Sequence, residues 1–128
     1  IWVSSAATGG ENGLKIRVYG TKGAVEWFQD DPNNLKFTEI NKPLKIITRA
    51  SSSVSKFSLT SSRLAAGHPE GFFEAFANIY TEFAEAIHKK IFKKSEFTFP
   101  NIEDGLRGIK FVFTAKKSSN NNAKWLKL

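Results

Sequence analysis

The chain has 128 residues, 41% of them hydrophobic and 24% charged, a composition typical of one globular domain that buries a core. It contains no cysteine, which excludes disulfides and thiolate metal sites, and no apolar run approaches the roughly 20 residues of a membrane helix. The net charge of +7 would suit a polyanion, but the basic residues are spread along the chain. We therefore expect no nucleic acid and no membrane as a partner.

Short strands are predicted over residues 1–49. Residues 14–19 alternate apolar and polar side chains, which is the period of a strand with one buried face. Gly20–Gly23 is typical of a tight hairpin whose glycines can take positive φ. We expect strands at about 14–19, 24–28, 35–38 and 44–48. The turns between them are too short for crossover helices, so the strands should pair antiparallel as a meander.

Two amphipathic helices follow a serine-rich segment at 50–66, which is predicted to be a loop. The first helix is expected from about Glu70 to Phe92, because its apolar residues recur at spacings of three and four. The second should begin after Asn101, which can act as its N-cap, with Asp104 completing a capping box. The three asparagines at 120–122 should end it.

The predicted fold class is α+β, a mostly antiparallel open sheet with helices packed on one face. The apolar stripe of the first helix, Phe73–Ile91, should face the sheet, and Gly105 and Gly108 indicate the close approach of another backbone to the second helix. Further strands are expected at Ile1–Val3 and Lys124–Leu128. Because the chain opens inside a strand-like run and contains no Met, we expect it to be a fragment of a longer protein.

The sequence gives no catalytic, cofactor-binding or metal-binding residue. No G-x-G-x-x-G segment opens a helix after a predicted strand, so the dinucleotide fingerprint is missing. The two histidines, His68 and His88, do not have the spacing of a metal-binding pair. None of the serines lies in a G-x-S-x-G elbow.

His68 is the single candidate substrate-binding residue. It precedes Pro69 at the predicted start of a helix, where free backbone N–H groups can bind an anion or a hydroxyl. An imidazole beside them could hydrogen-bond a sugar hydroxyl. The alternative is that the ring packs on its own turn and bonds a neighbouring carbonyl. Glu70 and Glu74 are expected to serve the positive end of the helix rather than chemistry.

Two blocks of the sequence carry a family resemblance. Gly67–Tyr80 reads GHPEGFFEAFANIY and Glu103–Gly108 reads EDGLRG, with weaker matches at 11–23 and 124–125. In this order the blocks resemble the C-terminal domain of the Gfo/Idh/MocA oxidoreductases, the glucose-fructose oxidoreductase and inositol dehydrogenase family. The resemblance implies that residues 1–128 are a C-terminal substrate and oligomerisation domain. It also implies an N-terminal Rossmann domain that binds NAD or NADP, and frequent self-association through the sheet.

The resemblance leads to an expected function. The chain would help to close the substrate pocket of an NAD(P)-dependent oxidoreductase that acts on a sugar or cyclitol hydroxyl, and would be inactive alone. An alternative is a non-catalytic homodimerisation module of the same fold, and a third hypothesis is a polyanion-binding domain. Apolar residues at Ile40, Ile46 and Ile47 favour a homodimer through the sheet face that helices leave uncovered. We expect a cytoplasmic protein.

Overall fold

The computed structural model describes residues 1–128, except for the side chain of Ser95. The chain forms two compact units. The sheet unit comprises Ser5–Asn78, and the helical unit comprises Ile1–Ser4 together with Ile79–Leu128.

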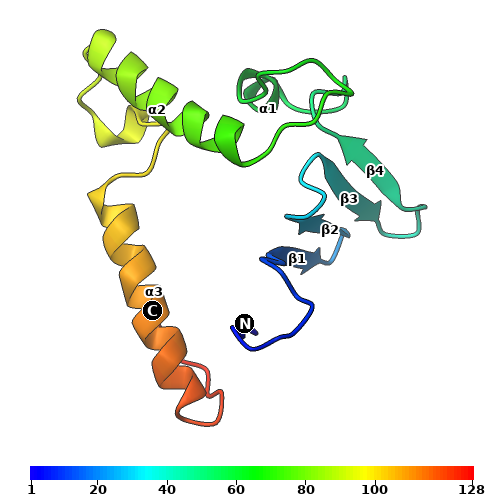
Figure 1. The fold of residues 1–128 in the computed structure, drawn as a ribbon, viewed down its shortest axis with the longest axis vertical. Helices are drawn as coiled ribbons and strands as arrows, with labels where there is room; N and C mark the ends of the chain where they lie inside the picture. Colours follow the sequence, from blue (N-terminus) through cyan, green and yellow to red (C-terminus); the bar gives the residue numbers. More distant parts are fainter. The chain divides into compact units, whose positions relative to one another are not determined.

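The sheet unit is built on a four-stranded antiparallel meander (Figure 1). Its strands are β1 (Lys15–Gly20), β2 (Gly23–Phe28), β3 (Asn34–Glu39) and β4 (Lys45–Thr48), and they lie in the order of the sequence. Each of the four strands predicted from the alternation and turn signals is therefore confirmed, as is the antiparallel pairing. The α+β class with an open antiparallel sheet is also confirmed.

The register separates the side chains into two different faces. Val18 pairs with Val25, which pairs with Phe37, so these three share one face. We call this the apolar sheet face; its apolar residues are Ile16, Val18, Val25, Trp27, Leu35, Phe37 and Ile47.

The opposite side, the polar sheet face, carries cross-strand ion pairs. Glu26 lies between Lys15 and Lys36, with Oε–Nζ distances of 3.2 and 3.0 Å. Hydrogen bonds from Lys36 and then Lys15 hold the pKa of the Glu26 carboxyl below its usual range. Ile46 lies on this face and Ile47 on the apolar sheet face, whereas Ile40 follows the end of β3 and belongs to neither face. The register thus places one of these three isoleucines on each face.

Gly23 has a steric role at the start of β2. The hairpin glycines were predicted to supply positive φ, but neither Gly20 nor Gly23 takes it. Instead, a Cβ added at Gly23 would collide with the backbone carbonyl of Thr38 and lie 3.3 Å from the Cα of Glu39. The close approach of β3 therefore requires glycine here.

Replacing Gly23 with Ala should lower the free energy of unfolding by about 1–3 kcal/mol, because β2 and β3 would have to move apart. Gly105 is the matched control, since a Cβ added there meets nothing within 4 Å. Gly105→Ala should raise stability by up to about 1 kcal/mol, because glycine is a poor helix former. Urea denaturation of both variants gives the comparison, and equal losses would contradict the steric role.

The serine-rich segment is not entirely a loop. It contains α1 (Lys56–Thr60), and the Oγ of Ser55 caps this short helix by accepting a hydrogen bond from the Ser58 N–H at 3.2 Å. The prediction missed α1 because serine disfavours helix interiors. The Ser55 side-chain cap offsets part of that cost.

The first long helix, α2 (Phe72–His88), is shorter than predicted at both ends. At its C-terminus Lys90 takes a left-handed φ of 53°. The Ile91 N–H then donates to the Ala86 carbonyl at 2.9 Å, and the Lys90 N–H donates to the Ile87 carbonyl at 3.1 Å. These are the two bonds of a Schellman motif, which ends the helix without glycine.

The second long helix, α3 (Ile102–Ser119), begins and ends where predicted. Asn101 accepts a hydrogen bond from the Glu103 N–H at 2.8 Å, and its own N–H donates to the Asp104 carboxylate at 3.0 Å. The capping box is therefore confirmed. The strands predicted at 1–3 and 124–128 are wrong, since neither segment is a strand. Gly105 and Gly108 face open space rather than another backbone.

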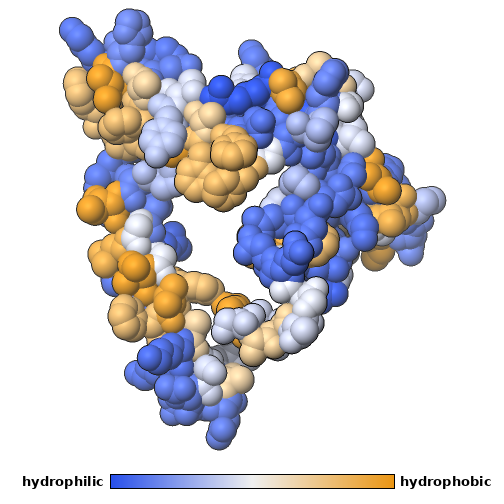
Figure 2. Space-filling view, in the orientation of Figure 1, coloured by the Kyte–Doolittle hydropathy of each residue, from blue (hydrophilic) through white to orange (hydrophobic). Residues whose placement is uncertain are grey.

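The apolar stripes of both helices are exposed in the described structure (Figure 2). Phe73, which was expected to contact the sheet, is 83% exposed. Aromatic side chains instead pack locally: the Phe72 and Phe76 rings lie 4.7 Å apart, and Phe83 meets Phe99 edge-on at 5.5 Å. Within the described residues, neither α2 nor α3 is long and apolar enough to cross a bilayer.

Candidate functional site

His68 lies exposed in the loop that connects α1 to α2. Gly67 takes a φ of 86°, and the His68 N–H donates to the Ala65 carbonyl at 3.2 Å, which closes a turn just before Pro69. The histidine therefore lies in a turn and not directly before the helix as predicted, because α2 begins only at Phe72.

The first N–H groups before α2 already have partners inside the protein. The Glu70 N–H donates to the Asn33 side-chain oxygen at 3.0 Å, and the Gly71 N–H donates to Glu74 Oε2 at 2.9 Å. The hydrogen bond from Gly71 is the main reason that the pKa of Glu74 is lowered. The capping role of Glu74 is confirmed, but these two N–H groups are not available to an anion beside His68.

A cavity of about 230 Å³ lies beside His68. It is formed where β3 begins, where β4 ends, and along the turn that contains the histidine. Its lining residues are Asn33, Asn34, Thr48, Arg49, Gly67, His68 and Pro69. The Thr48 hydroxyl and the His68 imidazole can each exchange hydrogen bonds with a hydroxylated ligand, so these two groups of the wall suit a polyol.

Arg49, which lines this cavity, forms an ion pair that the sequence did not indicate. Arg49 Nη1 lies 3.0 Å from Glu70 Oε1, and the side chains are only 17% and 6% exposed. Asn33 binds the Glu70 backbone on both sides, because its Nδ2 also donates to the Glu70 carbonyl at 2.9 Å. Glu70 had been assigned to the helix terminus; it serves instead as a buried anion that ties the loop to the sheet.

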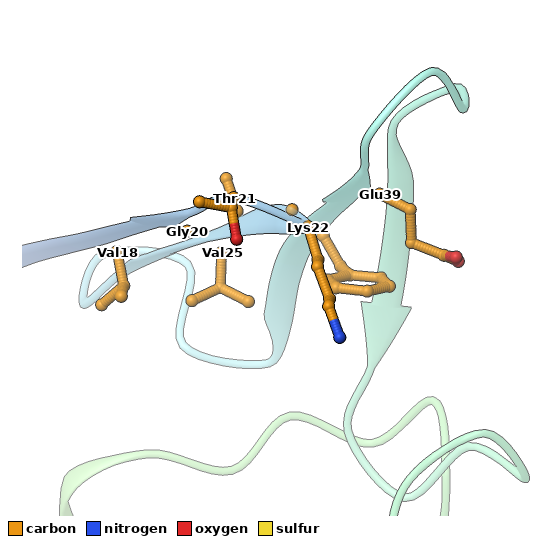
Figure 3. A pocket seen from close by; sticks show the side chains of 9 residues that line it. Val18, Gly20, Thr21, Lys22, Val25 and Glu39 are labelled. Carbon is orange, nitrogen blue, oxygen red and sulfur yellow. The ribbon is translucent and has the colours of Figure 1, made fainter.

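A second and wider cavity, of about 560 Å³, lies over the hairpin between β1 and β2. Val18 and Val25 point to the same side there, with Lys22 at the edge (Figure 3). Glu39 also lines it, but hydrogen bonds from Lys42 and Lys45 lower the pKa of this carboxyl to about 2. A carboxylate held by two lysines is poorly suited to proton transfer, so this cavity is a surface feature of the apolar sheet face.

The sheet is an antiparallel meander, whereas a nicotinamide-binding fold places pyrophosphate between a parallel strand and the helix that follows it. Among the described residues there is also no group of three His, Asp or Glu side chains that could hold a metal ion.

Comparison with models of known protein families identifies the family of this domain. The model of the family described as "Oxidoreductase family, C-terminal alpha/beta domain" (GFO_IDH_MocA_C) matches residues 1–128. The chain belongs to this family, the C-terminal domain of the Gfo/Idh/MocA oxidoreductases.

Relatives of known sequence or structure agree with this assignment. An uncharacterized oxidoreductase of Bacillus subtilis, YfiI, is 32% identical over 130 residues, which is 98% of this chain and 33% of the relative. An oxidoreductase structure from Sinorhizobium meliloti is 48% identical with a TM-score of 0.83, covering 94% of this chain and 34% of that one. An inositol dehydrogenase homologue from Azotobacter vinelandii, solved with NADH and myo-inositol, is 30% identical with a TM-score of 0.83. The match covers 98% of this chain and 34% of that one. This chain therefore spans about a third of the length of these proteins.

Proposed function

We propose that residues 1–128 are the C-terminal substrate and oligomerisation domain of an NAD(P)-dependent oxidoreductase that acts on a sugar or cyclitol hydroxyl. The observation that carries the proposal is the cavity beside His68, a residue on a loop that Arg49 and Glu70 anchor to the sheet. Support comes from the family match, and from the relative solved with NADH and myo-inositol.

In this proposal the cofactor, NAD or NADP, is bound by an N-terminal Rossmann domain of the full-length protein. The antiparallel sheet of this chain does not fit a dinucleotide, so we assign the chain no step in hydride transfer and expect it to be inactive alone. Its contribution is to bind and orient the polyol. We propose a cytoplasmic location for the enzyme.

His68 is the proposed substrate-binding residue. Its exposed imidazole lies at the cavity wall and can hydrogen-bond a hydroxyl of the polyol, as donor or acceptor. Its own backbone N–H is used by the turn, which leaves the ring as the part of the residue that can reach a ligand.

Replacing His68 with Ala in the full-length enzyme should raise the KM for the polyol by roughly three- to tenfold, the value of about one lost hydrogen bond. The kcat and the KM for the nucleotide should change little, because the interaction is made equally in the bound substrate and the transition state. Initial rates of nucleotide reduction measure these constants. His88→Ala is the control, since His88 is also exposed but ends α2. A polyol KM unchanged by His68→Ala would remove His68 from the site.

A non-catalytic homodimerisation module is the second candidate. The apolar sheet face favours it, because Ile16 is 56% and Val18 54% exposed there. Monomers seldom leave contiguous apolar surfaces of more than a few hundred Å² in water. A dimer through the sheet is compatible with either function, and we propose self-association in both cases. Nucleotide reduction by the full-length protein distinguishes the oxidoreductase from the non-catalytic module, because only the oxidoreductase would reduce NAD or NADP.

A further inference from the structure

The guanidinium of Arg49 is surrounded by acceptors from this chain. Its Nε donates to Asn33 Oδ1 at 2.9 Å, and its Nη1 lies 3.0 Å from Glu70 Oε1 in an ion pair. The remaining acceptors are the backbone carbonyls of Leu64, Ala65 and His68. Four hydrogen bonds and one ion pair thus engage the guanidinium within the protein. Arg49 lines the cavity, but its side chain is committed to partners in this chain.

These contacts connect three separate segments of the chain. Asn33 precedes β3, Arg49 follows β4, and the three carbonyls belong to the loop before α2. The backbone of Arg49 is held as well, because its N–H donates to the Asn33 carbonyl at 2.8 Å. Ala50, the next residue, takes a φ of 56°, which is unfavourable for a residue with a Cβ. The surrounding contacts therefore impose a strained turn directly after Arg49.

We propose that Arg49 is a positioning residue for polyol recognition, which sets the place of His68 without touching the ligand. Its Nη2 binds the His68 carbonyl, so the arginine holds the peptide from which the imidazole extends. The Glu70 carboxylate supports the arrangement from below, since it accepts a hydrogen bond from the Leu64 N–H in addition to pairing with Arg49. This role rests on the proposed function, in which His68 binds the substrate.

The test is a double-mutant cycle in the full-length enzyme. Arg49→Lys keeps the charge but offers three donors from one atom, which cannot span carbonyls and a carboxylate in a plane. It should raise the polyol KM by roughly three- to tenfold, no more than His68→Ala does, and leave kcat and the nucleotide KM within about twofold. Combined with His68→Ala it should add nothing, because Arg49 acts only through His68.

Two further variants make the result specific. Glu70→Gln keeps an acceptor for the Leu64 N–H and should raise the polyol KM less than Arg49→Lys does. This rise should also vanish when His68 is already replaced by alanine. Glu70→Gln therefore replaces Arg49→Lys in the test if the Arg49 variant folds poorly. Lys36→Met removes a cation from an exposed ion pair with Glu26 and should change no kinetic constant.

Two results would overturn the positioning role. One is a double variant whose polyol KM rises by the product of the two single-variant rises. The other is a polyol KM that Arg49→Lys leaves unchanged. A wild-type enzyme that reduces neither nucleotide with any polyol would instead overturn the proposed function, and this proposal with it.

Discussion

Replacing Glu70 with Ala is expected to lower the free energy of unfolding of this chain by about 3 kcal/mol, the effect of removing one partner of a buried ion pair. The Arg49 guanidinium would keep its carbonyl partners but lose its anion in a site where both side chains are largely shielded from water. The Leu64 N–H would lose its acceptor as well. The loop that carries His68 would then be held only by Asn33 and the remaining carbonyl contacts.

Urea denaturation of the 128-residue chain measures this effect. Glu85→Ala is the matched control: Glu85 also pairs with a cation, Lys89, at 2.6 Å, but both side chains are more than half exposed. Its removal should leave the denaturation midpoint nearly unchanged, because solvent screens such pairs. Similar denaturation midpoints for the two variants would contradict a stabilising buried ion pair at Glu70.

Replacing Val18 with Lys is expected to dissociate the homodimer that we propose through the apolar sheet face. Val18 lies opposite Val25 in the centre of that face, over the wider cavity (Figure 3). A lysine there would place a charge at the middle of an apolar contact, where burying an unpaired cation is costly. A symmetric dimer brings the same patch from both subunits together, so one substitution acts twice.

Light scattering at high micromolar concentration follows the mass. The wild-type chain should approach twice 14.3 kDa, and Val18→Lys should return it to the monomer. Tyr19→Lys is the control, since the neighbouring side chain points to the polar sheet face and is already exposed. A wild-type mass that stays at 14.3 kDa, or a dimer that only Tyr19→Lys breaks, would contradict the proposed interface.

Local patterns predicted much of the fold. The four strands followed from alternation over 14–48 and from turn residues, because each hairpin pairs neighbouring segments. The N-terminus of α3 followed from the Asn101 and Asp104 pair, a contact within one turn. By contrast, the predicted strands at 1–3 and 124–128 had no adjacent partner, and a strand forms only against another strand.

The candidate site was only partly predictable. His68 was chosen as a candidate because it stands beside proline and glycine in a block that resembles the family. The family is confirmed, and the role of His68 stays a prediction. Arg49 was missed because it is one of many basic residues, and its significance depends on three segments that only the fold brings together. Glu70 was assigned to a helix terminus because acidic residues are frequent there, whereas burial against Arg49 is a tertiary property.

We propose that this domain completes a polyol site in a nicotinamide-dependent oxidoreductase. The most direct measurement is reduction of NAD or NADP by the full-length protein in the presence of myo-inositol or simple sugars, alongside the 128-residue chain alone. We expect saturable, polyol-dependent reduction by the full-length protein and none by the isolated chain. Reduction of neither nucleotide by the full-length protein with any polyol, or nucleotide reduction by the isolated chain, would contradict the account.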